Sequence, residues 1–161
     1  MITVRKAEEK DKQVFIKMEK EFYRFYDAHG FDNHLKPLPH EDIPESFYAH
    51  TFDDLLSANG LFCVAEKDGC VVGYIEAEIV KPYEKELHAI TKTGHVNSLF
   101  IFEEYRKTGI AKRLLDEATK WMKPQGVELC TLSVVQGNTS ALAAYEKLGF
   151  GTERIRMWKK I

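Results

Sequence analysis

Apolar side chains recur along the chain at two spacings, one typical of helices and one typical of strands. Positions three or four residues apart form a single stripe in three stretches, which predicts helices over residues 14–27, 45–58 and 110–122. Short β-branched and aromatic runs predict strands over residues 2–5, 61–66, 71–80, 96–102 and 129–135. The alternation of these elements predicts one mixed α/β domain that spans residues 1–161.

Turn residues indicate how the middle strands meet. Asp68 and Gly69 lie between two apolar runs, which predicts a hairpin of antiparallel strands. Gly73 lies inside the second of these runs and indicates a bulge or a close backbone approach. On that strand one face is expected to carry Tyr74, Glu76 and Glu78, and the other Val71, Ile75 and Ile79.

The segment between the strand at 96–102 and the helix at 110–122 has the composition of an anion site. Its sequence is Arg-Lys-Thr-Gly-Ile-Ala, at positions 106–111. A helix begins with amide groups that have no partner inside the helix, and these amides favour a negatively charged ligand. Arg106 and Lys107 add positive charge, and Gly109 removes side-chain bulk at the turn. The segment therefore predicts a site for a ligand that carries phosphate.

Composition and charge restrict the class of protein. The chain has 161 residues, of which 44% are hydrophobic and 30% are charged, as in a soluble globular domain. A formal charge of -2 argues against non-specific nucleic-acid binding, so no nucleic-acid partner is expected. The three cysteines, at 63, 70 and 130, have no Cys-x-x-Cys spacing, so we expect buried thiols rather than a disulfide framework or a metal site. The absence of a signal peptide and of a long apolar run predicts a cytoplasmic protein with no membrane partner.

Two motifs carry a resemblance to a known family. Arg106-x-x-Gly109-x-Ala111 follows an apolar strand, and about 30 residues later residues 138–150 read Asn-Thr-Ser-Ala-Leu-Ala-Ala-Tyr-Glu-Lys-Leu-Gly-Phe. Together they resemble the acetyl-CoA signature and the second signature of the GNAT superfamily of N-acetyltransferases. The resemblance implies an α+β fold: a mixed, mostly antiparallel sheet of about six or seven strands, with helices on both faces and a splay between strands 4 and 5. Residues 150–158 would then form a further strand.

The resemblance also implies a cosubstrate and the residues that hold it. The cosubstrate would be acetyl-CoA, whose pantetheine arm would pair with the backbone of the strand around Leu99, Phe100 and Ile101. Its pyrophosphate would bind the amides of Lys107, Thr108, Gly109, Ile110 and Ala111, and the charge of Arg106 would reinforce the site. A further helix is predicted over residues 140–148. Asn138 would contact the pantetheine amides or cap this helix, and it could do both.

Transfer of an acetyl group to an amine needs an oxyanion donor, an acid and a base. The resemblance assigns the first to a backbone amide near Leu99. It assigns the second to Tyr145, as the acid that protonates the leaving thiolate; the alternative is a buried aromatic in the helix core. The base is open: a water relay held by Asn97 and Ser98 could serve, as could Glu76 or Glu78 from the adjacent strand, or His95. An enzyme that selects the neutral amine would need no dedicated base. The glutamates could equally be the solvated face of a sheet.

The sequence leaves the acceptor open. Glu76, Glu78, Glu84 and Glu86 suggest a cationic acceptor, either a small-molecule amine or an amine of a protein. The chain has neither the phosphate-binding motif of nucleotide kinases nor the Gly-x-Gly-x-x-Gly motif of dinucleotide-binding enzymes. An acyl-CoA-binding sensor or interaction module without transferase activity is the alternative. Homodimerisation is possible, and no feature of the sequence decides it.

Overall fold

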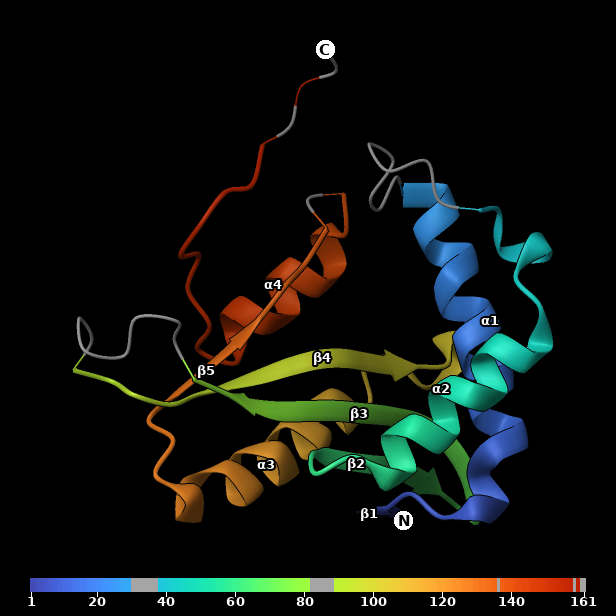
Figure 1. The fold of residues 1–161 in the computed structure, drawn as a ribbon, viewed down its shortest axis with the longest axis horizontal. Helices are drawn as coiled ribbons and strands as arrows, with labels where there is room; N and C mark the ends of the chain where they lie inside the picture. The colour runs from blue at the N-terminus through green and yellow to red at the C-terminus, as the bar shows by residue number, and fades with distance from the viewer. Residues whose placement is uncertain (30–37, 82–88, 136, 158, 160–161) are drawn as a thin grey trace.

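The structure is a computed structural model that describes residues 1–29, 38–81, 89–135, 137–157 and 159 (Figure 1). Its strands are β1 (Ile2–Lys6), β2 (Leu61–Lys67), β3 (Cys70–Val80), β4 (Thr93–Ile101) and β5 (Leu129–Leu132). Its α-helices are α1 (Lys12–His29), α2 (Glu45–Ser57), α3 (Ile110–Met122) and α4 (Thr139–Lys147). Each of the predicted elements up to residue 148 is therefore present, with ends that differ by a few residues.

The strands form one sheet in the order β1-β2-β3-β4-β5. Three neighbouring pairs are antiparallel, and β4 and β5 are parallel. The prediction of about six or seven strands is wrong, because the sheet in the described part of the chain has five. The expected strand over 150–158 is not seen over 150–157, where Ile155 is 80% exposed. After α4 the chain turns through Gly149, with φ of 91°, and runs away from β5, so this segment has no strand beside it (Figure 1).

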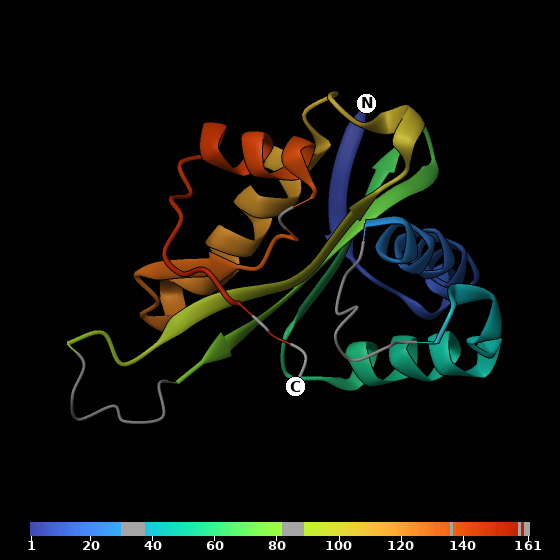
Figure 2. The same ribbon diagram turned by 90° about the horizontal axis from the view of Figure 1, so that it is seen from above.

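Helices cover both faces of the sheet, as Figure 2 shows. On one face α1 and α2 pack over a largely aromatic core that includes Phe15, Phe52, Phe62, Tyr74 and Phe100. On the other face α3 packs over an aliphatic core, whose members include Ile75, Val96, Ile110 and Leu114. The two cores show which side chains of β3 and β4 point toward α1 and which point toward α3.

Two bulges interrupt the sheet. Between β3 and β4 the pairs Glu76↔Ser98 and Ala77↔Val96 leave Asn97 as an extra residue. Val96 and Leu99 consequently both face α3 although they are an odd number of residues apart. A second register shift, opposite Ala65 and Glu66, lies beside Gly73. Gly73 also makes the predicted close approach, since a Cβ there would lie 2.6 Å from the Phe100 carbonyl oxygen.

The second bulge changes the expected faces of β3. Tyr74 and Glu76 share a face, as predicted, while Ile75 lies on the α3 side. Val71 packs against the aromatic core, so the prediction that it lies opposite Tyr74 is wrong. The reason is the extra residue, which reverses the alternation of side chains.

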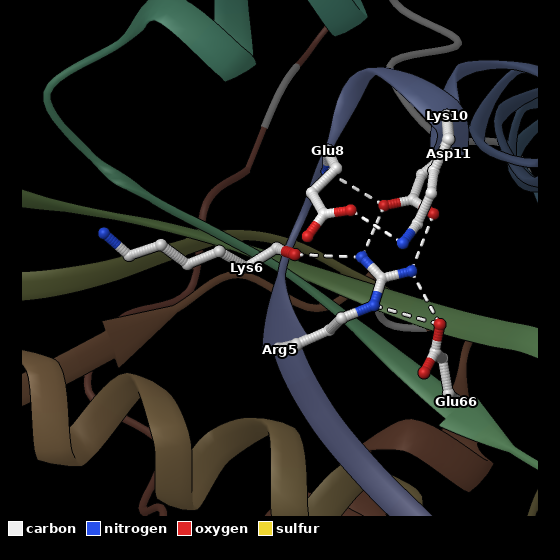
Figure 3. A network of polar contacts seen from close by, with 6 residues as sticks. All are labelled: Arg5, Lys6, Glu8, Lys10, Asp11 and Glu66. Carbon is white, nitrogen blue, oxygen red and sulfur yellow. Dashed lines mark hydrogen bonds and ion pairs between the residues drawn. The ribbon is translucent and has the colours of Figure 1, made fainter.

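A charged network joins β1, β2 and the segment before α1 (Figure 3). The Arg5 guanidinium donates to both carboxylate oxygens of Asp11, at 2.7 and 2.8 Å, and to Glu66 at 2.6 Å. Asp11 is only 3% exposed, and it also accepts a hydrogen bond from the Glu8 amide at 2.9 Å. The network thus anchors the start of α1 against the sheet edge farthest from β5.

Three expectations from the sequence concern the cysteines, metal sites and membrane-spanning helices. Cys63 is buried and Cys130 is half-buried, but Cys70 is exposed at the β2–β3 turn, so the prediction of three buried thiols is wrong for Cys70. Within the described residues no group of His, Cys, Asp and Glu side chains is arranged to hold a metal ion. No helix among the same residues has the length and apolarity needed to cross a bilayer.

Candidate active site

The predicted phosphate site is a turn with two left-handed residues at the start of α3. Lys107 has φ of 63° and Gly109 has φ of 85°. The first helical hydrogen bond runs from the Arg113 amide to the Gly109 carbonyl, at 3.2 Å. The amides of residues 107–111 donate to no acceptor in the described part of the chain. Five consecutive donors at the positive end of the α3 dipole therefore remain available to an anion.

The side chains of this turn hold its shape. Thr108 donates its hydroxyl to the Tyr105 carbonyl at 2.6 Å. Arg106 donates its Nε to the Ile101 carbonyl at 3.1 Å, so this side chain ties the turn to the end of β4. A Cβ placed on Gly109 would meet no atom within 4 Å, which leaves the backbone open to close approach by a ligand.

The edge of β4 that faces β5 is open over half its length. Pairing between the two strands covers only Thr93–Val96 of β4, and β4 continues to Ile101. Figure 1 shows β5 running away from β4 toward α4. The side chains of Leu99 and Phe100 contribute to the two cores, so the backbone of residues 97–101 is what faces the opening. An extended ligand can add to such an edge as another strand does.

The helix α4 borders the same opening from the other side. Asn138 caps it, with its side-chain oxygen accepting the Ala141 amide at 3.1 Å, so the capping role is confirmed. Tyr145 lies half-buried against the aliphatic core and against Phe150, with ring centroids 5.7 Å apart. Burial raises the pKa of Tyr145 above its usual value, which keeps the phenol protonated. A protonated phenol at this place can serve as an acid or simply as core.

Two of the predicted base candidates interact directly. The Asn97 side chain at the bulge donates to Glu76 Oε1 at 2.8 Å. Burial raises the pKa of Glu76, the bond from Asn97 opposes that rise, and the charge of Glu78 adds to it. All three residues line a pocket of about 500 Å³ between the end of α2 and β3, whose rim also carries Lys81 and Lys92.

The other predicted residues lie elsewhere. His95 pairs β4 to β5 through a 2.8 Å contact between its Nδ1 and Thr131 Oγ1, which is a structural position. Glu84 and Glu86 lie outside the described residues.

Sequence reasoning missed a buried carboxyl group on the α1 side of the sheet. Glu19 of α1 is 6% exposed and accepts a short hydrogen bond from the Tyr74 hydroxyl of β3. The signal was present in the sequence, because Glu19 lies on the same helical stripe as Phe15 and Phe22. An acidic residue in an apolar stripe is an exception that calls for a buried partner.

Comparison with known proteins gives one family. The chain matches the model of the Acetyltransferase (GNAT) family over residues 19–150. It is 40% identical over 112 residues to a protein named N-alpha-acetyltransferase from Saccharolobus solfataricus, which corresponds to 67% of each chain. A protein of the same name from Sulfurisphaera tokodaii is 38% identical over 112 residues, again 67% of each chain.

Solved structures share the fold. Aminoglycoside N-acetyltransferase AAC(6')-Iy in complex with CoA matches with a TM-score of 0.76, over 99% of this chain and 95% of that chain. The two sequences are 18% identical, so this likeness concerns the fold alone. Since the family model covers most of the chain and the relatives are N-acetyltransferases, the chain belongs to the GNAT family and is an N-acetyltransferase whose cosubstrate is acetyl-CoA.

Proposed function

We propose that the enzyme acetylates the free α-amine of a polypeptide, by direct attack of that amine on the thioester of acetyl-CoA. The observation that carries this proposal is the open edge of β4 beside a turn with free amides, next to a pocket that holds Glu76 and Asn97. The cosubstrate lies along that edge, and the acceptor enters through the pocket.

The chain's backbone holds the cosubstrate. The amides of residues 107–111 bind the pyrophosphate, with Arg106 and Lys107 supplying positive charge nearby. Residues 99–101 pair with the pantetheine amides, and Asn138 contributes its side-chain amide nitrogen from the start of α4. The Leu99 amide donates to the oxyanion. Acetyl-CoA supplies the activated acetyl group, and the residues named here orient it.

Tyr145 acts as the general acid. Its phenol remains protonated because burial raises its pKa, so it has a proton to give to the leaving thiolate. Glu76, with Asn97 bound to it, faces the pocket and attracts the positive charge of the incoming amine.

The pocket favours a peptide over a polycation. Its lining includes Glu76 and Glu78 but also Lys81 and Lys92, so its negative and positive charges are balanced. A polyamine carries several positive charges, which the two lysines would repel, whereas one α-ammonium group can be matched by one carboxylate. The names of the relatives from Saccharolobus solfataricus and Sulfurisphaera tokodaii point the same way.

Release of the coenzyme A thiol with a panel of acceptors tests the proposal. The panel contains a peptide with a free N-terminus, the same peptide with a blocked N-terminus and an internal lysine, spermidine, and an aminoglycoside. We expect thiol release with the first peptide, and a mass increase of one acetyl group on its N-terminal residue. Release with spermidine or the aminoglycoside alone would refute the acceptor class. Tight binding of acetyl-CoA without release for any acceptor would instead support the binding-module alternative.

A further inference from the structure

Three polar side chains from three elements lie on the face of the sheet that carries Glu76, a residue of the acceptor pocket. The Tyr74 hydroxyl of β3 donates to the Glu19 carboxylate of α1. Ser98 of β4 lies diagonally across from Tyr74 on the same face of the sheet, because Ser98 pairs with Glu76 and Tyr74 pairs with Phe100. It acts to lower the pKa of the Tyr74 phenol, as a donor to the phenol oxygen does. Glu19 and Tyr74 are 6% and 1% exposed, whereas Ser98 is half-buried. The line therefore runs from a partly accessible serine to an enclosed carboxylate.

The packing gives no structural reason for a carboxylate at residue 19. Its neighbours are the aromatic core of α1 and β3, including Phe15 and Phe22. A carboxylate in such surroundings loses hydration, and one hydrogen bond from a neutral phenol compensates only in part. No cation pairs with Glu19 in the described part of the chain, in contrast to Asp11, which has Arg5. A group retained at such a cost is a candidate for function.

The outer end of the line lies at the proposed reaction centre. Ser98 follows the Asn97 bulge and directly precedes Leu99, whose amide is the proposed oxyanion donor. The bulge turns Ser98 to the same face as Tyr74 and Glu76. The Tyr74 hydroxyl donates inward to Glu19, and a Ser98 hydroxyl that donates to Tyr74 continues the line in the same direction. An oxygen lone pair of Ser98 is therefore left to accept a proton from outside.

We propose that Ser98, Tyr74 and Glu19 form a proton relay that takes a proton from the acceptor ammonium group and stores it on the Glu19 carboxylate. This inference rests on the proposed function and adds the missing base to it. One proton enters at Ser98, the Ser98 proton passes to the Tyr74 oxygen, and the Tyr74 proton passes to Glu19. The relay oxygens end uncharged, and Glu19 ends as a neutral acid.

The remaining steps balance. The neutral amine forms a bond to the acetyl carbon, and the carbon–sulfur bond breaks with its electron pair on sulfur. The new amide loses its second nitrogen proton, and the thiolate gains one from Tyr145, which is reprotonated by that nitrogen proton through solvent. After the product leaves, Glu19 returns its proton to solvent along the same line. The net change is an ammonium group and a thioester converted to an amide, a thiol and one released proton.

The groups around Glu19 suit a reversible base near neutral pH. Burial raises the pKa of Glu19 to about 7; the bond from Tyr74 acts against that rise and the charge of Glu76 on β3 adds to it. Tyr23 on α1 and Tyr48 on α2 are the other titratable groups that face it, and both have a pKa raised by burial. These phenols are neutral in the working range, so they do not titrate alongside Glu19 there.

The test is the pH dependence of turnover for Glu19→Gln, Tyr74→Phe and Ser98→Ala. Each variant removes one proton-transfer group with little change in volume. We expect each to lower kcat/KM by about 10²-fold near pH 7. The deficit should shrink above about pH 8, where a peptide α-amine is already neutral. A double variant should lose no more than a single one, because the three groups act as one unit.

Tyr48→Phe is the matched control. Its hydroxyl is fully buried with no partner in the described part of the chain, so its removal should leave the pH profile unchanged. Thermal unfolding and acetyl-CoA binding should be close to wild type for all four variants, which separates a proton-transfer defect from a folding defect.

The outcomes separate the relay from the function on which it rests. Wild-type activity with an unchanged profile in Glu19→Gln and Tyr74→Phe overturns the relay and leaves the proposed function intact. If the rise of turnover with pH is lost in Glu76→Gln but kept in Glu19→Gln, the base is Glu76, and this result also overturns the relay. A wild-type protein that acetylates no amine overturns the proposed function itself, and the relay with it.

Discussion

The turn before α3 gives the sharpest prediction, the replacement of Gly109 by valine. Gly109 has φ of 85°, a conformation in which a β-branched residue is a genuine outlier. A Cβ at this position would meet no atom within 4 Å, so the effect comes from the backbone and not from a clash. Left-handed backbone costs an ordinary L-residue about 1–2 kcal/mol, and the turn can avoid this cost only by rotating.

Rotation would redirect the amides that we assign to the pyrophosphate. A hydrogen bond to a charged group contributes about 1.5–3 kcal/mol, and about 1.4 kcal/mol is a tenfold change in affinity. Loss of a single such bond therefore predicts coenzyme A binding weaker by about 10- to 100-fold in Gly109→Val. Isothermal titration calorimetry with coenzyme A measures this directly.

Gly126→Val provides a matched control at the other end of α3. Gly126 has φ of 77° and equally open surroundings, so the two variants carry the same backbone penalty. Both should lower the melting temperature, by about 2–4 °C for each kcal/mol. Only Gly109→Val should weaken coenzyme A binding. If the two variants bind coenzyme A within twofold of each other, the assignment of the phosphate site to this turn is wrong.

Three further predictions concern the acid, the charged network and the sheet. Tyr145→Phe should lower kcat by at least about 10²-fold in steady-state assays, with acetyl-CoA affinity almost unchanged; weaker binding at full turnover would contradict the role of an acid. Asp11→Asn should lower the free energy of unfolding by about 3 kcal/mol in urea at neutral pH, because Arg5 loses a buried partner. Burial acts to raise the pKa of Asp11, but the bonds from Arg5 and the Glu8 amide outweigh it and leave that pKa below its usual value. The stabilisation by Asp11 is thus complete above its pKa in the unfolded chain, and it is lost as the pH falls through its pKa in the folded protein. The difference in the free energy of unfolding between variant and wild type should therefore narrow in strong acid. A difference that stays constant with pH would exclude the ion pair as its cause. Gly73→Ala should cost about 2 kcal/mol, since its Cβ would lie 2.6 Å from a backbone oxygen, whereas Gly94→Ala should cost less because it meets the flexible end of Met122; equal losses in chemical denaturation would refute this.

Local patterns were enough to predict much of the fold. The apolar stripe of α3, the Asp68-Gly69 hairpin and the turn around Gly109 were each encoded by a few neighbouring residues, and the structure confirms them. The cap at Asn138 was predicted for the same reason. A pattern that depends on the chain's own spacing can be recognised without knowledge of what packs against it.

Features that depend on partners distant in sequence could not be predicted in this way. The bulge at Asn97 is defined by the register against β3, and alternation alone gives no sign of an extra residue. The segment 150–157 has the composition of a strand, but a strand also needs a partner, and after α4 the chain runs away from β5, the last strand of the sheet (Figure 1). Glu19 and Tyr74 are 55 residues apart, so only the folded chain shows that each is the other's partner.

The extra residue in β4 also sets a rule for how this strand can vary. Deleting that one residue would move every following side chain of the strand to the opposite face of the sheet. Phe100 would then lie in the aliphatic core and Leu99 among the aromatic rings. Ser98 would be turned away from Tyr74 by the same step. Functional homologues should therefore keep the length of this strand fixed even where its side chains differ. Insertions or deletions of two residues should be tolerated better than those of one residue.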